Sequence, residues 1–272
     1  MLKALKKILR DNIKNRARTV SLARIIIQRD YKGSDLGWLW AFAQPIVYVL
    51  AFYLAISIGF KSAKDIDGIV TPYFIWLVSG LMAWFYMRDM FTGGPAIFPK
   101  YRQLIGKTAF PISTIPVAAA LSKFWVHMIV MAGVLVLTIC CGCAPSIYWI
   151  QLPFYMLMMM LFAAVWSLGA GLLTLLSRDF YNMIKAIKPV FFWLSGILFN
   201  INADRITDGM QVFFILNPFS YIVEGYRNTI CYHVWFFEEW QKLLCYLGIL
   251  FIFTLIMLWL YKKLRKSVPD IV

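Results

Sequence analysis

Long runs without charged residues dominate the hydropathy pattern of the chain. About 20 consecutive apolar residues are enough for a helix to cross the hydrocarbon core of a bilayer. The pattern predicts six transmembrane helices, over residues 38–60, 71–87, 115–140, 149–176, 189–203 and 243–261. The fifth run is short for a crossing unless the flanking Lys185 and Lys188 extend toward the interface. We therefore expect an all-α integral membrane protein.

The third and fourth helices are predicted from one continuous uncharged stretch. Residues 124–177 contain no Asp, Glu, Lys or Arg. A single helix of this length would be about 80 Å long, which is far more than a bilayer. A Gly/Pro/Ser cluster at residues 142–146 is typical of a turn, so we expect the chain to reverse there.

One further uncharged run, residues 209–223, contains Asn217-Pro218 in its middle. If this run crossed the membrane, the basic cluster near the C-terminus would lie outside the cell. With six crossings, 21 Lys/Arg and 6 Asp/Glu fall on one side, whereas 5 Lys/Arg and 7 acids fall on the other. The positive-inside rule predicts such a bias for cytoplasmic segments. We expect both termini in the cytoplasm, and residues 209–223 as a re-entrant helical hairpin on the outer side.

The first segment is expected to lie on the membrane surface. Apolar residues recur at helical spacing up to about Thr19, with lysines and arginines around them. Such an amphipathic helix lies in the interface near anionic head groups, although a helix packed on a partner protein would show the same pattern. The predicted organisation is an interface helix in residues 1–37, a transmembrane domain in residues 38–264 and a cytoplasmic tail in residues 265–272.

Composition supports a membrane protein and excludes other classes. Hydrophobic residues make up 61% of the chain and charged residues 15%, unlike a soluble domain. The net charge of +14 follows from the topology, so it does not indicate a nucleic-acid partner. Cys140, Cys141 and Cys143 have no fourth ligand at zinc-site spacing, so no metal is expected. The five cysteines are expected to serve packing, with a disulfide on the outer side as the alternative.

No catalytic or nucleotide site is expected in this chain. Residues 106–108, Gly-Lys-Thr, resemble the end of a phosphate-binding loop, but Tyr101 stands where that loop needs a glycine. Carboxylates are scattered, whereas a membrane transferase would need them clustered. Lys123 and His127 lie four residues apart in the third span, either as a packed pair or as a functional site. The span cores hold no acid, which disfavours ion-driven transport and favours an external energy source.

Aromatic residues make up 17% of the chain, and many fall within the predicted spans. Most are expected to serve as interfacial belts and packing. Rings at mid-span would also suit a path along which sugar rings slide by stacking. The candidates for such a polymer path are Tyr48, Phe52, Trp76, Trp84, Phe192 and Trp193.

Four motifs, in order, resemble those of ABC-2 type polysaccharide-export permeases. The first is Tyr-Lys-Gly-Ser-Asp-Leu-Gly-Trp-Leu-Trp at residues 31–40, followed by Pro45. The second is Lys-Thr-Ala-Phe-Pro-Ile-Ser-Thr-Ile-Pro at residues 107–116, and the third is Ser-Arg-Asp-Phe at residues 177–180. One departure is Asp35, where the family usually has an uncharged residue. The fourth motif comprises Asn217, Pro218, Glu224, Tyr226 and Arg227.

This resemblance implies an assembly. Two copies of the chain would form a homodimer, joined to two copies of a separate ABC ATPase that would hold ATP and Mg²⁺. This chain itself would need no cofactor. The polymer path would lie at the dimer interface.

The resemblance also implies roles for three groups of residues. The residues of the loop after the second span that would couple to the ATPase are Tyr101, Arg102, Lys107 and Phe110. The residues of the interface and gate would be Tyr31, Lys32, Trp38 and Trp40. The outer re-entrant segment would include Asn217, Pro218, Glu224 and Arg227. We further expect Lys32 and nearby cations to meet the diphosphate of a lipid-linked polymer through charge-assisted hydrogen bonds.

The function that follows from the resemblance is export, without enzymatic activity in this chain. We expect the permease subunit of an ATP-driven exporter, in a bacterial plasma membrane, that moves an undecaprenyl-diphosphate-linked glycopolymer outward. The second motif is most similar to the teichoic-acid branch, so teichoic acid is the preferred substrate. The alternatives are an O-antigen or capsular polysaccharide exporter, an ABC-2 lipid or drug exporter, and a membrane glycosyl- or phosphotransferase.

Overall fold

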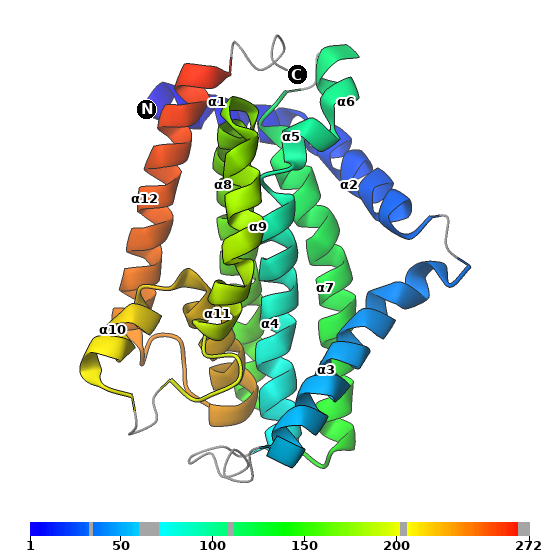
Figure 1. The fold of residues 1–272 in the computed structure, drawn as a ribbon, viewed down its shortest axis with the longest axis vertical. Coiled ribbons are helices and arrows are strands. Elements are labelled where there is room, and N and C mark those ends of the chain that lie inside the picture. The colour runs from blue at the N-terminus through cyan, green and yellow to red at the C-terminus, as the bar shows by residue number, and fades with distance from the viewer. Residues whose placement is uncertain (33–34, 60–70, 108–110, 202–205, 266–272) are drawn as a thin grey trace.

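A computed structural model describes residues 1–32, 35–59, 71–107, 111–201 and 206–265 (Figure 1). Every regular element within these ranges is a helix, which confirms the all-α fold class. The helices form an elongated bundle, and α1 (Leu2–Lys14) lies across one end of it. We call this the basic end, because α1 is rich in lysine and the last turn of α12 (Trp240–Leu264) carries Lys262 and Lys263 at the same end.

Four segments among the described residues are long and apolar enough to cross a membrane. They are Gly37–Ala55, Thr114–Cys140, Ile147–Leu176 and Trp240–Leu264. These segments comprise η1 (Gly37–Leu39) with most of α3 (Trp40–Gly59), α7 (Thr114–Cys140), η3 (Ile147–Gln151) with α8 (Leu152–Leu176), and α12. The predicted first, third, fourth and sixth spans therefore have helices of the required length. The count of six crossings stays a prediction.

The second predicted span corresponds to α4 (Tyr73–Gly93), which forms the centre of the bundle (Figure 1). It is 21 residues long, but it carries Arg88 and Asp89 near its end at the basic side. Most of its side chains are buried, because five helices pack against it, namely α3, α7, α8, α9 (Arg178–Trp193) and α11 (Pro218–Arg227).

The predicted boundaries of the fifth span, 189–203, are wrong. The helix in this region is α9 (Arg178–Trp193), which starts eleven residues earlier and leaves helical geometry after Trp193. Its N-terminus is fixed by Ser177, whose hydroxyl accepts a hydrogen bond from the Asp179 N–H (3.2 Å). The helix is amphipathic, and a search for uncharged runs passes over a helix with charges on one face.

The N-terminal segment differs from the single helix expected up to about Thr19. Two helices, α1 and α2 (Arg16–Tyr31), meet at Asn15. The amphipathic pattern of α1 is confirmed, because Ala4 and Ile8 are buried while the lysines lie outside. Helix α2 runs obliquely down the bundle along α7, and its far end meets the start of α3 (Figure 1).

The expected turn after the third span is confirmed at Gly142, which follows the last turn of α7. Its φ of +85° lies in the left-handed region that favours glycine. The five cysteines have free thiols in this structure; Cys231 is buried, as a packing role requires, whereas Cys140 and Cys141 are exposed.

The run 209–223 is broken where the sequence predicted. Helices α10 (Asp208–Ile215) and α11 (Pro218–Arg227) flank Asn217, and a short π-helix, η4 (Asn228–Tyr232), follows. The Asn217 side-chain oxygen accepts a hydrogen bond from the Phe219 N–H (3.0 Å) and so caps α11. Both helices are too short to cross a bilayer and lie at the end opposite α1 (Figure 1). Their location in the outer leaflet stays a prediction.

Candidate functional site

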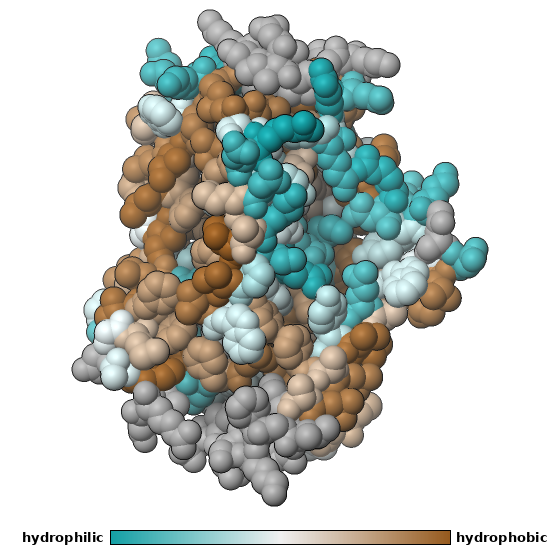
Figure 2. Space-filling model, in the orientation of Figure 1, coloured by the Kyte–Doolittle hydropathy of each residue, from teal (hydrophilic) through white to brown (hydrophobic). Residues whose placement is uncertain are grey.

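A groove lined by aromatic rings lies between α3, α4 and α9. Its volume is about 520 Å³. Hydrophilic residues reach from the basic end to about mid-height of this face and across its upper right, while the left side and the lower right are apolar (Figure 2). We call this cavity the aromatic groove. Its lining includes Tyr48, Phe52, Trp84, Phe85, Phe192, Arg88, Asp89 and Lys188.

The rings of the aromatic groove contact one another across the three helices. The centroid of Phe52 is 5.2 Å from that of Phe192, and Phe192 is 5.4 Å from Trp84. Tyr48 and Phe85 are 5.9 Å apart. An apolar ring face beside polar side chains suits a sugar, which has an apolar face and hydroxyl edges.

Four of the six predicted polymer-path residues therefore share one groove, namely Tyr48, Phe52, Trp84 and Phe192. The other two do not. Trp76 is fully buried in the core, and Trp193 is 60% exposed and does not line the groove. The charged pair Arg88 and Asp89 was missed, although two charges directly after an uncharged run are visible in the sequence.

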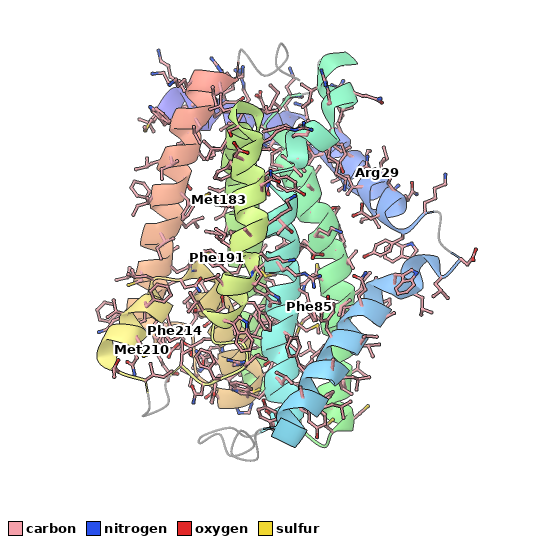
Figure 3. The ribbon with its side chains drawn as sticks, in the orientation of Figure 1. Arg29, Phe85, Met183, Phe191, Met210 and Phe214 are labelled. Carbon is pink, nitrogen blue, oxygen red and sulfur yellow. The ribbon has the colours of Figure 1, made fainter. Side chains whose placement is uncertain are left out.

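A second cavity, with charged walls, adjoins the aromatic groove. It lies between α2, α3, α4 and α7, and its volume is about 490 Å³. Gln44, Phe85, Arg88 and Asp89 line both cavities, so the two are neighbours. Figure 3 shows Phe85 between α4 and α3, at this boundary. We call this second space the charged cavity.

Ion pairs hold the charged cavity together. The Asp30 carboxylate lies 2.8 Å from the Lys123 ammonium and 3.5 Å from that of Lys100. Arg88 and Asp89 form a neighbouring pair at 2.8 Å. Asp30 comes from α2, Lys100 from α5 (Ile97–Lys100) and Lys123 from α7, so three helices meet at one carboxylate.

The structure separates Lys123 and His127, which the sequence placed together. Lys123 turns to Asp30, whereas the His127 Nε2 lies 2.8 Å from the Tyr226 hydroxyl of α11. His127 is buried and packs its ring against Tyr86 (5.6 Å). Of the two interpretations, a hydrogen-bonded structural position fits His127.

The pKa of Asp30 gives a test of this ion pair. Burial raises the pKa of the carboxyl, but the hydrogen bond and charge of Lys123, with Lys100, lower it more, so the pKa lies below its ordinary 3.8. A lowered pKa stabilises the folded state above about pH 4, and this contribution is lost as the pH falls through the folded value.

Asp30→Asn should therefore destabilise the protein by about 1 kcal/mol or less at pH 7. The difference between the unfolding midpoints of variant and wild type should hold near neutral pH and narrow as the pH falls below about 4, which thermal unfolding between pH 3 and 7 would measure. A difference that stays constant over this range would contradict the ion-pair assignment.

Three of the predicted gate residues surround the junction of α2 and α3. The rings of Tyr31 and Trp38 stack, with centroids 5.1 Å apart and planes at 21°. Trp40 and Tyr31 line the charged cavity, and Lys32 follows directly after α2. The aromatic stack and the charged cavity therefore adjoin each other.

Comparison with known sequences agrees with this arrangement. The family described as ABC-2 type transporter matches residues 18–231 of the chain. The chain belongs to the ABC-2 type transporter family. A relative, the O-antigen export system permease protein RfbA of Myxococcus xanthus, is 20% identical over 84% of this chain and 85% of its own length. Two proteins of that name from Klebsiella pneumoniae are each 24% identical over 89% of both chains.

The predicted coupling segment of this ABC-2 transporter chain lies at the basic end. Helices α5 and α6 (Arg102–Lys107) project there (Figure 1). Arg102 is exposed, whereas Tyr101 is buried with the Arg29 guanidinium 5.1 Å from its ring. Lys107 ends α6, and Phe110 lies outside the described residues. Within this segment, Arg102 is accessible to a partner and Tyr101 fixes the segment to α2.

The predicted outer segment of the ABC-2 transporter chain is anchored by Arg227. Its guanidinium donates hydrogen bonds to the carbonyls of Gly196 (2.7 Å) and Ile197 (2.5 Å) and lies 3.4 Å from the centre of the Trp76 ring. This arginine is 2% exposed. Residues from α4, α11 and the segment after α9 thus meet at one side chain.

A second polar cluster holds the other side of α11. The Lys242 ammonium lies 2.8 Å from a Glu224 oxygen and 2.7 Å from a Glu239 oxygen. Asn228 donates a hydrogen bond to Glu239 (2.7 Å). Of the predicted outer residues, Asn217 and Pro218 begin α11, while Glu224 and Arg227 tie it to its neighbours.

Proposed function

We propose that the chain is the membrane permease of an ATP-driven exporter of a lipid-linked cell-surface polysaccharide. The observation that carries this proposal is the aromatic groove, in which rings from α3, α4 and α9 meet beside charged side chains. An aromatic ring can pack against the apolar face of many different sugars, so a chain of many sugars can move past such rings.

The relatives favour one class of substrate. They are named O-antigen export system permeases, and they match this chain over more than four fifths of its length. This supports a polysaccharide of the O-antigen or capsule type over teichoic acid, which the second sequence motif had favoured. A lipid or drug exporter would have less use for several aromatic rings next to charges.

The proposed assembly is a homodimer with two copies of a separate ABC ATPase, in a bacterial plasma membrane with both termini in the cytoplasm. Helix α3 leaves many large apolar side chains exposed, including Ile46, Val47, Leu50 and Leu54. A second copy of the chain and lipid would cover them. The polymer would carry an undecaprenyl diphosphate anchor.

The direct test is deletion of the gene in its host. Loss of surface polysaccharide, with lipid-linked polymer accumulating inside the cell, is the expected result, and the wild-type gene should restore export. Normal surface polysaccharide in the deletion strain would contradict the proposal. Loss of polymer synthesis itself, tested in membrane extracts, would instead indicate a transferase.

Coupling to the ATPase gives a separate prediction. The double variant Arg102→Glu with Lys107→Glu reverses two charges at the basic end, so docking of the ATPase should weaken and export should fall at least about tenfold. Export and co-purification of the ATPase would be measured together. Arg178→Glu, an exposed arginine at the start of α9, is the control and should keep most activity. Full export by the double variant would remove this segment from the coupling role.

A further inference from the structure

A third cavity adjoins the charged cavity, on another side of α3. This apolar cavity lies between α3, α4 and α7 and has a volume of about 390 Å³. Pro45, Met82 and Val130 line both it and the charged cavity, so the two are neighbours. Its walls are apolar throughout and include Phe42, Val49, Phe74, Val78 and Leu137.

Three adjoining cavities therefore lie against α3 in the order apolar, charged, aromatic. A lipid-linked glycan has its parts in the same covalent order, a hydrocarbon chain, a phosphate group and sugars. We propose that the three cavities bind one such molecule, with the first isoprene units of its chain in the apolar cavity, its diphosphate in the charged cavity and its first sugars in the aromatic groove. This inference rests on the proposed function, because it takes a lipid-linked polymer as the cargo.

The order of the charged and apolar cavities along the bundle fits a lipid whose head group lies in the leaflet at the basic end. Helix α7 starts at that end (Figure 1), and the charged cavity is lined by its residues Lys123 to Val130. The apolar cavity is lined by the later residues Val130 to Leu137, so it lies farther from the basic end. Lipid chains also point from the interface toward the middle of the bilayer.

The charges of the middle cavity suit a phosphate group. Three cations, Arg88, Lys100 and Lys123, and two carboxylates, Asp30 and Asp89, line it, which leaves a net charge of +1. The Asp30 carboxylate lies between the ammonium groups of Lys100 (3.5 Å) and Lys123 (2.8 Å). It occupies the place that an anionic ligand needs, so binding of a diphosphate transfers both lysines from Asp30 to the ligand.

This exchange predicts opposite effects for the two sides of the ion pair. Asp30→Asn removes the competing carboxylate and should strengthen binding about fivefold, although it weakens the ligand-free fold. Lys100→Gln with Lys123→Gln removes the cations and should weaken binding about tenfold or more. If the ion pair served only to stabilise the fold, both Asp30→Asn and the double lysine variant should bind the probe more weakly than wild type. Lys262→Gln, an exposed lysine at the end of α12, is the matched control.

The apolar cavity has a test of its own at Gly133. A Cβ at this residue would meet no atom within 4 Å, so Gly133→Leu adds its side chain to open space at the cavity wall. The variant should weaken binding by competing with the hydrocarbon chain. Gly248→Leu on α12 is the matched control, because it is also an exposed glycine with no atom within 4 Å of an added Cβ.

The experiment measures binding to the purified full chain in phosphatidylcholine nanodiscs. The probe is undecaprenyl diphosphate, with undecaprenol, inorganic diphosphate and phosphatidylglycerol as separate arms, and native mass spectrometry gives the bound fraction. Undecaprenyl diphosphate should bind best, since its diphosphate offers more negative charge and more acceptor oxygens to the three cations than the single phosphate of phosphatidylglycerol, and inorganic diphosphate lacks a hydrocarbon chain. Equal binding of phosphatidylglycerol or of inorganic diphosphate would overturn the proposal, as would identical affinities for the Asp30 and lysine variants.

Failure of this inference is distinct from failure of the proposed function. If the lysine and Gly133 variants bind the probe normally while cells export polysaccharide, the site is wrong and the exporter assignment stands. If deletion of the gene leaves surface polysaccharide unchanged, the proposed function and its substrate site both fall.

Discussion

Removing the two rings that face each other across the aromatic groove should reduce polysaccharide export about tenfold. Phe52 and Phe192 come from α3 and α9, and their centroids are 5.2 Å apart. One aromatic contact contributes about 0.5–1.5 kcal/mol beyond its buried area, so two contacts together correspond to about tenfold. The double variant Phe52→Ala with Phe192→Ala would be compared with wild type for surface polysaccharide per folded permease.

Two further variants of Phe192 distinguish stacking of sugar on the ring from simple filling of volume by the side chain. Phe192→Tyr keeps the ring and should keep most export, whereas Phe192→Leu keeps much of the volume but loses the ring and should resemble Phe192→Ala. Trp193→Ala, at the exposed neighbouring position, is the control and should change little. Equal export from the leucine and tyrosine variants would show that the rings fill space and do not bind sugar.

The second large effect is expected at Arg227. Arg227→Leu should lower the stability of the fold by about 3 kcal/mol or more, because the carbonyls of Gly196 and Ile197 lose their donor and the Trp76 ring loses its cation. The midpoint of thermal unfolding should fall by about 10 °C, which fluorescence-detected size exclusion after heating would measure. Arg178→Leu, an exposed arginine, is the control. An unchanged or raised midpoint for Arg227→Leu would contradict the anchoring role.

A glycine on α4 tests the same anchor from the other side. A Cβ at Gly80 would lie 2.7 Å from the Nη2 atom of Arg227, which must then leave its carbonyl partners. Gly80→Ala should therefore destabilise the fold in the same way. Gly169→Ala is the matched control, because its nearest contact would be an ordinary 3.5 Å to Met257. If both alanine variants unfold at the same temperature, the position of Arg227 does not matter for the fold.

The sequence predicted those elements in which one local signal decides the structure. Length and hydrophobicity alone indicated the helices of α7, α8 and α12, and the Gly142 turn and the Asn217 break followed from residues with strong local preferences. Helix α9 was misplaced because Lys185 and Lys188 interrupt its apolar pattern while its amphipathic face still packs on α4 and α8.

The candidate site was predicted only in part, because its contacts join residues that are distant in the chain. Four of the six rings chosen as polymer-path candidates lie in one groove, because their spans face one another, and their role in transport stays a prediction. The Asp30 to Lys123 pair joins residues 93 positions apart, and Arg227 meets Trp76 across 151. Spacing along a helix placed Lys123 beside His127. In the folded chain, however, Lys123 pairs with Asp30 of α2 and His127 contacts the Tyr226 hydroxyl of α11.

The uneven burial of the helices bears on how a long polymer can pass. Only 11% of the apolar stretch within Gly37–Ala55 is buried by the rest of the chain, compared with 56% of that within Ile147–Leu176. The three cavities all lie against α3, on opposite sides of it. A tilt of this one helix would widen one space at the expense of another while α4, α8 and α11 keep their packing. Of the four long apolar segments, the one that includes α3 would therefore lose the least packing if it moved to admit sugars of different width.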